Sequence, residues 1–196
     1  MFVTERLVLR RWKPEDLEPY VEICSDSDVM RWIGGGQVRT RVECAEAIAS
    51  FESAWEDRGF GLFALELRAS CGLIGFVGLS VPDFLPEILP SVEIGWRLAA
   101  AQWGKGLATE GARAALAFGF GQVGLDRIVS IHQVGNDASG RIMEKLGMHL
   151  ERERVDPSGA RAVRVYEITR SDWGRLCGLG NSKEHRGGWW LSTARG

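Results

Sequence analysis

The sequence predicts an α/β domain, built as a mixed, largely antiparallel sheet with helices on both faces. Three observations predict it. Segments in which apolar and polar residues alternate, as in strands, are interspersed with segments of helical spacing. Two pairs of such strands are separated only by short turns, which is typical of antiparallel hairpins. Between residues 91 and 132 a strand, a helix and another strand follow one another, which is the order of a parallel βαβ unit.

The composition favours a soluble globular protein with one main domain. The 196 residues are 45% hydrophobic and 26% charged, which suffices for a sizeable core. The formal net charge of −2 argues against a nucleic-acid surface as the main partner. The four cysteines lack CxxC spacing, and we recognise no signal peptide and no apolar run of the roughly 20 residues that span a bilayer. We therefore expect reduced thiols, a cytoplasmic location and no membrane contact.

In the first third of the chain, the residue pattern predicts one strand and two helices. Residues 5–11 alternate as a strand does. Pro14, followed by two acidic residues, marks the start of a helix that should run to about Cys24. Apolar residues at helical spacing predict a second helix over residues 41–58. Between the helices, Trp32 opens a glycine-rich loop.

Two hairpins frame the rest of the sheet. The first comprises residues 60–67 and 72–80, and a proline-rich loop follows it. A short β-branched strand at 127–132 precedes a helix that we expect over Ser139 to Leu146. The last hairpin should join residues 149–155 to 162–169 around an Asp-Pro-Ser-Gly turn.

The stretch from residue 91 to 120 carries the chemistry. In its strand, Val92, Ile94 and Trp96 alternate with polar or small residues, so Glu93 lies on the opposite face from the apolar set. The turn at 103–108 follows, with two glycines and an alanine where a ligand would approach the backbone closely.

A helix is expected from Thr109 to Phe120, with its first turn at this loop. The unpaired N–H groups and the positive end of the helix dipole therefore face the loop. Such a helix N-terminus is suited to binding phosphate.

Two familiar phosphate-binding patterns do not fit the loop. A P-loop requires glycine where Ala99 stands, and Ser or Thr where Gly106 follows Lys105. The dinucleotide fingerprint GxGxxG fails because Thr109 occupies its last position. A nucleotide-dependent oxidoreductase is therefore disfavoured.

A third pattern, Gln/Arg-x-x-Gly-x-Gly/Ala between a strand and a helix, fits Trp103-x-x-Gly106-x-Ala108 except at its first position. With it, the sequence from residue 4 to 173 resembles the GCN5-related N-acetyltransferase (GNAT) superfamily and, within it, the RimJ/RimL branch. Five motifs in the family's order carry the resemblance: TERLVLR (4–10), MRWIGG (30–35), EIGW (93–96), WGKGLATE (103–110), and Asn136-x-x-Ser139 leading into MEKLGM (143–148).

The resemblance implies acetyl-CoA as cosubstrate, with its pyrophosphate on the loop amides and its pantetheine arm beside the preceding strand. A backbone N–H near Trp96 to Leu98 would meet the oxyanion of the tetrahedral intermediate. Trp32 would overhang the acceptor cleft, unless it only pins its loop to the core. The predicted acetyl-CoA-binding residues are Trp96, Arg97, Leu98, Trp103, Gly104, Lys105, Gly106, Leu107, Ala108, Thr109, Asn136 and Ser139.

Acetyl transfer to an amine benefits from a base, because amines are mostly protonated at neutral pH. Glu93 is the best-placed carboxylate, the alternative being a solvent-facing or salt-bridged strand residue. Many relatives place a thiolate-protonating tyrosine where this chain has Met143. Ser139, which resembles the serine assigned as general acid in the RimL-like branch, is therefore the predicted acid, unless it only caps the helix.

Other polar residues of this region have structural interpretations. Glu110 complements the helix dipole, and Lys105 is either a phosphate contact or a solvated charge. His132 and His149 are isolated from other ligand-type residues, so no metal is expected.

The sequence thus predicts an N-acetyltransferase that acts by direct transfer on a protein N-terminus or a small-molecule amine; the alternative is a non-catalytic relative that binds and senses CoA. The domain should cover residues 1–173. A glycine-rich tail (174–196) carries two adjacent tryptophans that would suit contact with a partner subunit, as in a homodimer.

Overall fold

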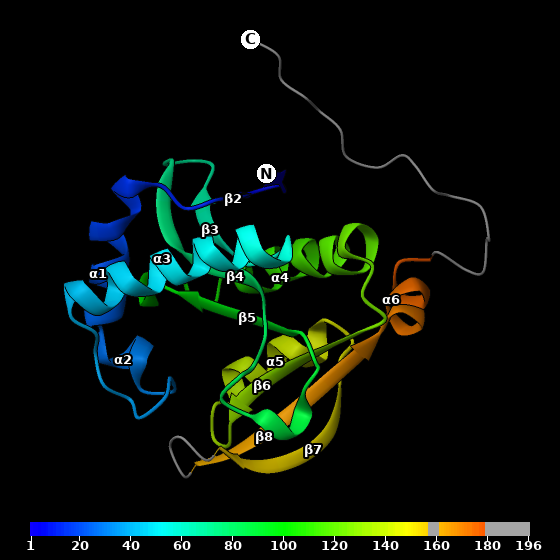
Figure 1. Ribbon diagram of the computed structural model, residues 1–196. Coiled ribbons are helices and arrows are strands. Elements are labelled where there is room, and N and C mark those ends of the chain that lie inside the picture. The colour runs from blue at the N-terminus through cyan, green and yellow to red at the C-terminus, as the bar shows by residue number, and fades with distance from the viewer. Residues whose placement is uncertain (157–160, 179–196) are drawn as a thin grey trace.

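The computed structural model describes residues 1–156 and 161–178, which form a single eight-stranded mixed sheet (Figure 1). Every neighbouring pair of strands is antiparallel except β5 and β6, which are parallel. The predicted α/β class and the central βαβ unit are thereby confirmed. In spatial order the strands are β1 (Phe2–Val3), β2 (Leu7–Arg10), β3 (Leu62–Leu67), β4 (Gly72–Ser80), β5 (Glu93–Leu98), β6 (Arg127–Gln133), β8 (Arg161–Thr169) and β7 (His149–Asp156).

Helices cover both faces of the sheet, as the alternation along β3 illustrates. Phe63 and Leu65 belong to the main core, whereas Leu62 and Ala64 belong to a second cluster on the opposite face. The main core is covered by α4 (Leu107–Phe118) and α5 (Asp137–Lys145), and the second cluster by α1 (Leu17–Ser25) and α3 (Arg41–Arg58). The shorter elements are η1 (Pro14–Asp16), α2 (Ser27–Met30), η2 (Pro86–Ile88), η3 (Ala100–Gln102), η4 (Gly119–Val123) and α6 (Arg170–Leu176).

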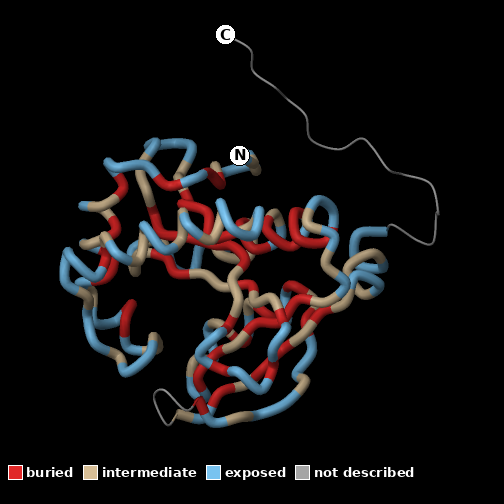
Figure 2. Tube along the Cα trace, viewed as in Figure 1, coloured by how far each residue is buried: buried red, intermediate tan, exposed pale blue. Residues whose placement is uncertain are grey.

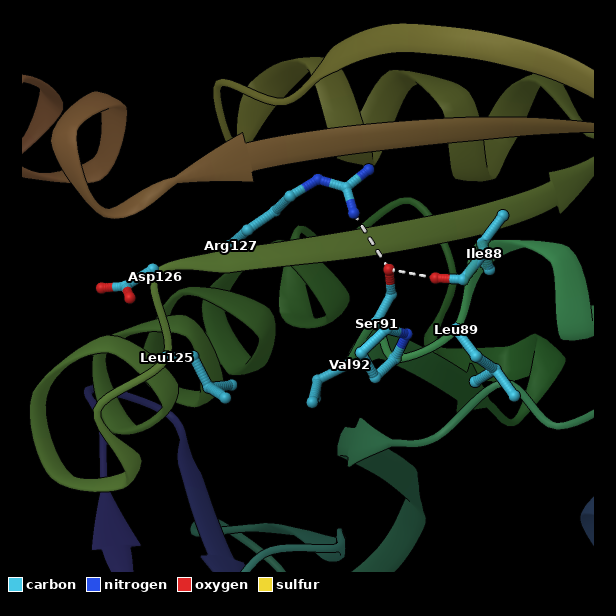
Figure 3. Close-up of a pocket in the computed structure, with 8 residues that line it drawn as sticks. Ile88, Leu89, Ser91, Val92, Leu125, Asp126 and Arg127 are labelled. Carbon is cyan, nitrogen blue, oxygen red and sulfur yellow. Dashed lines mark hydrogen bonds between the residues drawn. The ribbon is translucent and has the colours of Figure 1, made fainter.

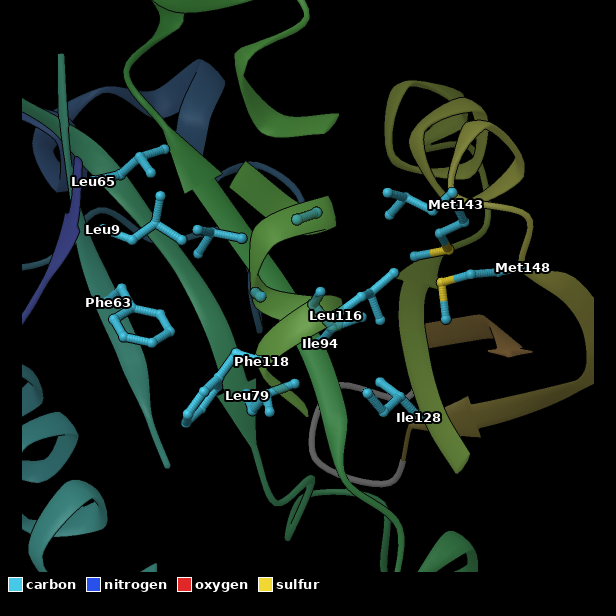
Figure 4. Close-up of a cluster of buried hydrophobic side chains, with 14 of the residues drawn as sticks. Leu9, Phe63, Leu65, Leu79, Ile94, Leu116, Phe118, Ile128, Met143 and Met148 are labelled. Carbon is cyan, nitrogen blue, oxygen red and sulfur yellow. The ribbon is translucent and has the colours of Figure 1, made fainter. Parts of the chain in front are cut away.

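The main core lies between the sheet and α4, where the buried segments of several strands converge (Figure 2). Leu116 of α4 and Ile94 of β5 are fully buried in it (Figure 4). Met143 of α5 is only 1% exposed in the same core. The position where many relatives have tyrosine thus contributes to packing here.

Two predicted helices begin two residues earlier than expected. The helix expected from Thr109 begins at Leu107, because Gly106 adopts a left-handed conformation (φ 77°) and turns the chain directly into α4. The helix expected from Ser139 begins at Asp137, because Asn136 supplies the N-cap. The domain boundary expected after Trp173 falls inside α6. The predicted tail from residue 179 onward lies outside the described residues.

The parallel pairing of β5 and β6 is very short. One register pair, Glu93 with Val129, joins the two strands, and the Val129 N–H donates to the Val92 carbonyl at 2.9 Å. One step further, the carbonyl of Ile94 accepts the side-chain hydroxyl of Ser130 at 2.9 Å. The two strands therefore diverge toward their carboxyl ends, the end at which ligands of α/β sheets bind.

Candidate active site

The divergence of β5 from β6 leaves backbone groups of β5 directed into the opening. Ala99 donates its N–H to Ile74 on the β4 side, whereas the carbonyls of Val92 and Ile94 serve the β6 side. Because successive residues of a strand alternate in direction, the N–H groups of Trp96 and Leu98 face β6, beyond the last paired residue. These are donors of the kind that an oxyanion needs.

The loop between η3 and α4 is open on its ligand side. Gly104 and Gly106 have φ values of 73° and 77°. A Cβ at Gly104 would meet nothing within 4 Å, and one at Gly106 would meet only the Arg6 Nη2 at 3.6 Å. Within the described chain, the backbone N–H groups of residues 104–109 donate to no backbone carbonyl. A helix N-terminus with this many free donors fits a pyrophosphate.

Contacts from behind hold this loop in place. The indole of Trp103 donates to the carbonyl of Leu98 at 2.9 Å, so the residue that departs from the family pattern anchors the loop to the end of β5. Arg6 donates to the carbonyl of Lys105 at 2.8 Å. The ammonium of Lys105 contacts Gln102 at 3.1 Å, which leaves its predicted phosphate contact a prediction.

Glu110 ties the N-terminal segment to the same loop. Its carboxylate accepts from the Thr4 hydroxyl at 2.6 Å and from the Arg6 backbone and guanidinium at 2.8 and 2.7 Å. Burial raises the pKa of Glu110, but the hydrogen bonds from Thr4 and Arg6 outweigh burial, so the pKa is lowered. A permanently ionised, fully bonded carboxylate has the structural role expected of Glu110.

Glu93 has a different environment. It is half-buried, and no basic side chain of the described residues lies within ion-pair distance, so it is not the salt-bridged residue of the alternative interpretation. Burial raises the pKa of Glu93 to about 8, although a hydrogen bond from the Ile131 N–H opposes the increase. A carboxyl group with a pKa near the working pH suits a general base.

Asn136 and Ser139 lie at the start of α5. The Asn136 side chain accepts the Ser139 N–H at 3.3 Å and caps the helix. The interpretation of Ser139 as the cap is therefore wrong. The Ser139 hydroxyl makes no hydrogen bond to other described residues and is half-buried, so it is free for a ligand.

Trp32 packs over the connection between β6 and α5. A Cβ at Gly135 would lie 3.2 Å from its ring. The loop that carries Trp32 is fixed by two residues to which the sequence drew no attention: Gln133 donates to Gly34 and Arg161 donates to Gly35, each at 2.9 Å. Trp32 is thus beside the segment that carries Asn136, and it belongs to none of the three buried hydrophobic clusters of the described residues.

Arg97, which was predicted to bind acetyl-CoA, has its side chain away from the glycine-rich loop. Its guanidinium is under α1, where it donates to the Tyr20 hydroxyl at 3.1 Å. The backbone N–H groups of β5 alternate in direction, so the Arg97 N–H, like that of Ala99, points toward β4 and away from the opening.

A separate hollow of about 370 Å³ lies at the other end of the two strands (Figure 3). Residues 88–92, which precede β5, and residues 125–127, which lead into β6, line it. Ser91 spans it by donating to the Ile88 carbonyl and accepting from Arg127. Because the glycine-rich loop follows β5, this hollow is distant from the predicted acetyl-CoA site.

The described residues contain no group of three or more His, Cys, Asp or Glu side chains that could hold a metal ion. In residues 1–156 and 161–178, no helix combines the length and apolar character needed to cross a membrane.

Comparison with known proteins gives a consistent result. Residues 6–149 match the family model described as acetyltransferase (GNAT) domain. The uncharacterized N-acetyltransferase YnaD of Bacillus subtilis is 32% identical over 148 residues, which cover 76% of this chain and 82% of the relative. A crystal structure of a GNAT-family acetyltransferase from Bacillus anthracis superposes with a TM-score of 0.72 at 29% identity, covering 87% of this chain and 99% of that one.

A further structure, spermidine N-acetyltransferase from Vibrio cholerae in complex with CoA and spermine, has a TM-score of 0.70 at 22% identity, with coverage of 87% and 99%. At that identity the likeness concerns the fold. Assignment to the RimJ/RimL branch stays a prediction. The family match covers well over half of the chain, and with the strand opening and the free loop amides it establishes that the chain belongs to the GNAT family of acetyl-CoA-dependent N-acetyltransferases.

Proposed function

We propose that this protein transfers the acetyl group of acetyl-CoA directly to a primary amine, with Glu93 as general base and Ser139 as donor to the departing sulfur. The observation that carries the proposal is the position of Glu93, a carboxyl group with a raised pKa and no ion-pair partner among the described residues, on the same strand as the N–H groups of Trp96 and Leu98. A module that only bound CoA would have no use for such a group. Catalysis is therefore favoured over the sensing alternative.

The proposed reaction begins with acetyl-CoA bound along the strand opening. Its pyrophosphate accepts from the amides of residues 104–109, with Leu98 beside the pantetheine arm and Asn136 opposite. The thioester carbonyl accepts from the N–H of Trp96 or Leu98, which stabilises the negative charge that develops on attack.

The chemical step then forms one bond and breaks one. The amine nitrogen attacks the acetyl carbon, its proton passes through a water molecule to Glu93, and the C–N bond forms. Collapse of the tetrahedral intermediate breaks the C–S bond, and Ser139 donates its hydroxyl proton to the departing thiolate. Solvent water then returns a proton to Ser139 and takes the proton held by Glu93, so both groups are restored. The products are an N-acetylated acceptor and CoA thiol. No covalent enzyme intermediate is needed.

The test is release of CoA thiol from acetyl-CoA with a panel of amines: N-terminal peptides, polyamines and aminoglycosides. With the best acceptor, Glu93→Gln and Ser139→Ala should each lower kcat by about 10²- to 10⁴-fold, as loss of a general base or acid typically does. Glu46→Gln is the matched control, since Glu46 is exposed on α3 and unpaired within the described residues. Near-normal kcat in both site variants would contradict the proposed roles.

A further inference from the structure

Arg97 is a buried cation that has no carboxylate partner among the residues that the structure describes. The residue is only 8% exposed. Its Nη1 donates to the Tyr20 hydroxyl at 3.1 Å and contacts the Cys24 sulfur at 3.3 Å, and its Cζ lies 5.2 Å from the centre of the Phe76 ring. None of these partners is an anion. A buried charge without a counter-charge is costly, so this arrangement needs an explanation.

Arg10 shows how the same fold treats an arginine that is buried for structure. Arg10 is also 8% exposed, but its guanidinium forms a two-pronged pair with Asp16 at 2.7 and 2.8 Å. Glu66 accepts from the remaining Nε at 2.7 Å. Every charge-bearing edge of Arg10 is thus satisfied from within the chain, and Arg97 is the exception.

Two donors of Arg97 are left over. The Nε is sealed from solvent and has no hydrogen-bond partner. The Nη2 also has no partner among the described residues, but it is not sealed from solvent. The Nε and Nη2 of a guanidinium form the edge that binds a carboxylate through two parallel hydrogen bonds. An anion from outside can therefore reach Arg97 at the Nη2, and the neighbouring Nε, which is sealed from solvent, would complete the two-pronged pair after a local movement of the side chain.

The face that carries Arg97 is the face of the proposed base. Glu93, Gly95 and Arg97 share one side of β5 because side chains alternate along a strand. A Cβ at Gly95 would meet nothing within 4 Å, so the space above the strand is open between the two charged residues. Four strand residues separate the Cα atoms of Glu93 and Arg97 by about 13 Å.

A second cation reinforces the local charge. Burial raises the pKa of Tyr20, and the positive charge of Arg97, which bonds this hydroxyl, and then that of Arg39 oppose the increase. Arg39 makes no ion pair within the described residues. After the hydrogen bonds from Thr40, the charge of Arg39 also lowers the pKa of Glu43, so part of that charge is offset there. Arg97 is therefore the main source of the potential that attracts anions and repels polyamines.

We propose that Arg97 binds a carboxylate of the acceptor, so that the natural acceptor is a primary amine carrying a carboxylate several bonds from its nitrogen. The inference rests on the proposed acetyl transfer, because the amine must reach the acetyl group near Glu93 while the carboxylate reaches Arg97. The two side chains reach toward each other, so the acceptor needs to span only part of the separation of about 13 Å between the Cα atoms. An ω-amino acid, or a peptide whose second residue is acidic, places its nitrogen and carboxylate far enough apart for this, whereas a short α-amino acid does not.

Matched pairs of acceptors test the proposal: 6-aminohexanoate against its amide, and the peptide amide Gly-Glu against Gly-Gln. For the wild-type enzyme we expect kcat/KM to favour the acid of at least one pair by about 10- to 100-fold, the range of a charge-assisted hydrogen-bonded pair. The pair that shows the preference distinguishes a small acid from a peptide. Spermidine should be a poor acceptor.

Variants then assign the preference to Arg97. Arg97→Met, of similar length but neutral, should abolish the acid preference mainly through KM, while turnover of the neutral amides changes little. Arg97→Lys should restore part of it. Arg58→Met is the charge-matched control, because Arg58 is exposed on α3 and forms no ion pair with described residues. Acetyl-CoA affinity and melting temperature of each variant report on folding.

Failure of this inference is distinguishable from failure of the proposed function. Equal kcat/KM within both wild-type pairs, or a preserved preference in a folded Arg97→Met variant, would overturn the carboxylate site while leaving acetyl transfer intact. If no amine yields CoA thiol, the proposed function fails, and calorimetry of 6-acetamidohexanoate with the CoA-bound protein tests Arg97 separately. Binding by wild type and its loss in Arg97→Met support the site; absence of binding overturns it.

Discussion

At the scale of the residue, the protonation of Glu93 decides when the enzyme can work. Burial places the pKa of Glu93 at about 8, so the basic form increases as the pH rises through that value. We expect kcat/KM, corrected for ionisation of the amine, to rise between pH 6.5 and 9 with an apparent pKa of about 8. Glu93→Gln should remove this ascending limb. A profile that stays flat in the wild type would contradict the assignment.

The same pKa predicts an effect on stability. Glu93 has a higher pKa when folded, about 8, than its ordinary value of 4.5, so between these values the folded state binds more protons than the unfolded state. The free energy of unfolding contributed by this group therefore falls as the pH rises from 4.5 to 8. Glu93→Gln should be more stable relative to wild type at pH 8.5 than at pH 5, as measured by urea unfolding. A difference of the opposite sign would show that Glu93 is stabilised as a carboxylate.

At the scale of the element, the start of α5 assigns helix capping and the proposed catalytic role to two different residues. Asn136 provides the cap, so Asn136→Ala should lower the free energy of unfolding by about 1 kcal/mol. Ser139→Ala should leave unfolding nearly unchanged and lower kcat. The reverse pattern would return Ser139 to a structural role.

In the loop before α4, the effect of a substitution on CoA binding can likewise be distinguished from its effect on backbone strain. Gly106→Val places a branched side chain at φ 77°, against the pyrophosphate, and should weaken CoA binding at least 100-fold by calorimetry. Gly59→Val is the control, because Gly59 ends α3 at φ 72° with nothing within 4 Å of its Cβ. Both variants carry the same backbone strain, and only the first should lose CoA. Unchanged affinity in a folded Gly106→Val variant would place the cosubstrate elsewhere.

At the scale of the whole molecule, CoA should stabilise the fold by binding the native state alone. A ligand at 100 times its Kd contributes about 2.7 kcal/mol, which corresponds to roughly 5–10 °C in a domain of this size. NAD at the same concentration should give no shift, since the loop lacks the dinucleotide spacing. A shift with NAD and none with CoA would contradict the loop assignment.

The sheet, its hairpins and the conformation of the glycine-rich loop could be predicted because each depends on local signals, namely alternation, turn residues and glycine spacing. The predicted starts of α4 and α5 were less accurate, because several neighbouring residues in each case could serve as N-cap, and the sequence does not show that Gly106 and Asn136 take this position. The roles of Arg161 and Arg97 were beyond prediction. The first contacts a loop 126 residues away, and the second is distinguished only by lacking a partner, which no sequence pattern records.

The divergence of β5 and β6 has one more consequence, which concerns the rung that would come next in their ladder. In a parallel pair, the Ile131 N–H would bond the Ile94 carbonyl. Instead the Ser130 hydroxyl donates to the Ile94 carbonyl, and the Glu93 carboxyl accepts from the Ile131 N–H. Two side chains thus take the place of the next backbone hydrogen bond between the strands. Glu93 is thus both spacer and proposed base. Glu93→Gln keeps a side-chain oxygen that can accept from the Ile131 N–H but removes the base. Glu93→Ala should instead allow β5 and β6 to pair further, across the proposed position of the acetyl group.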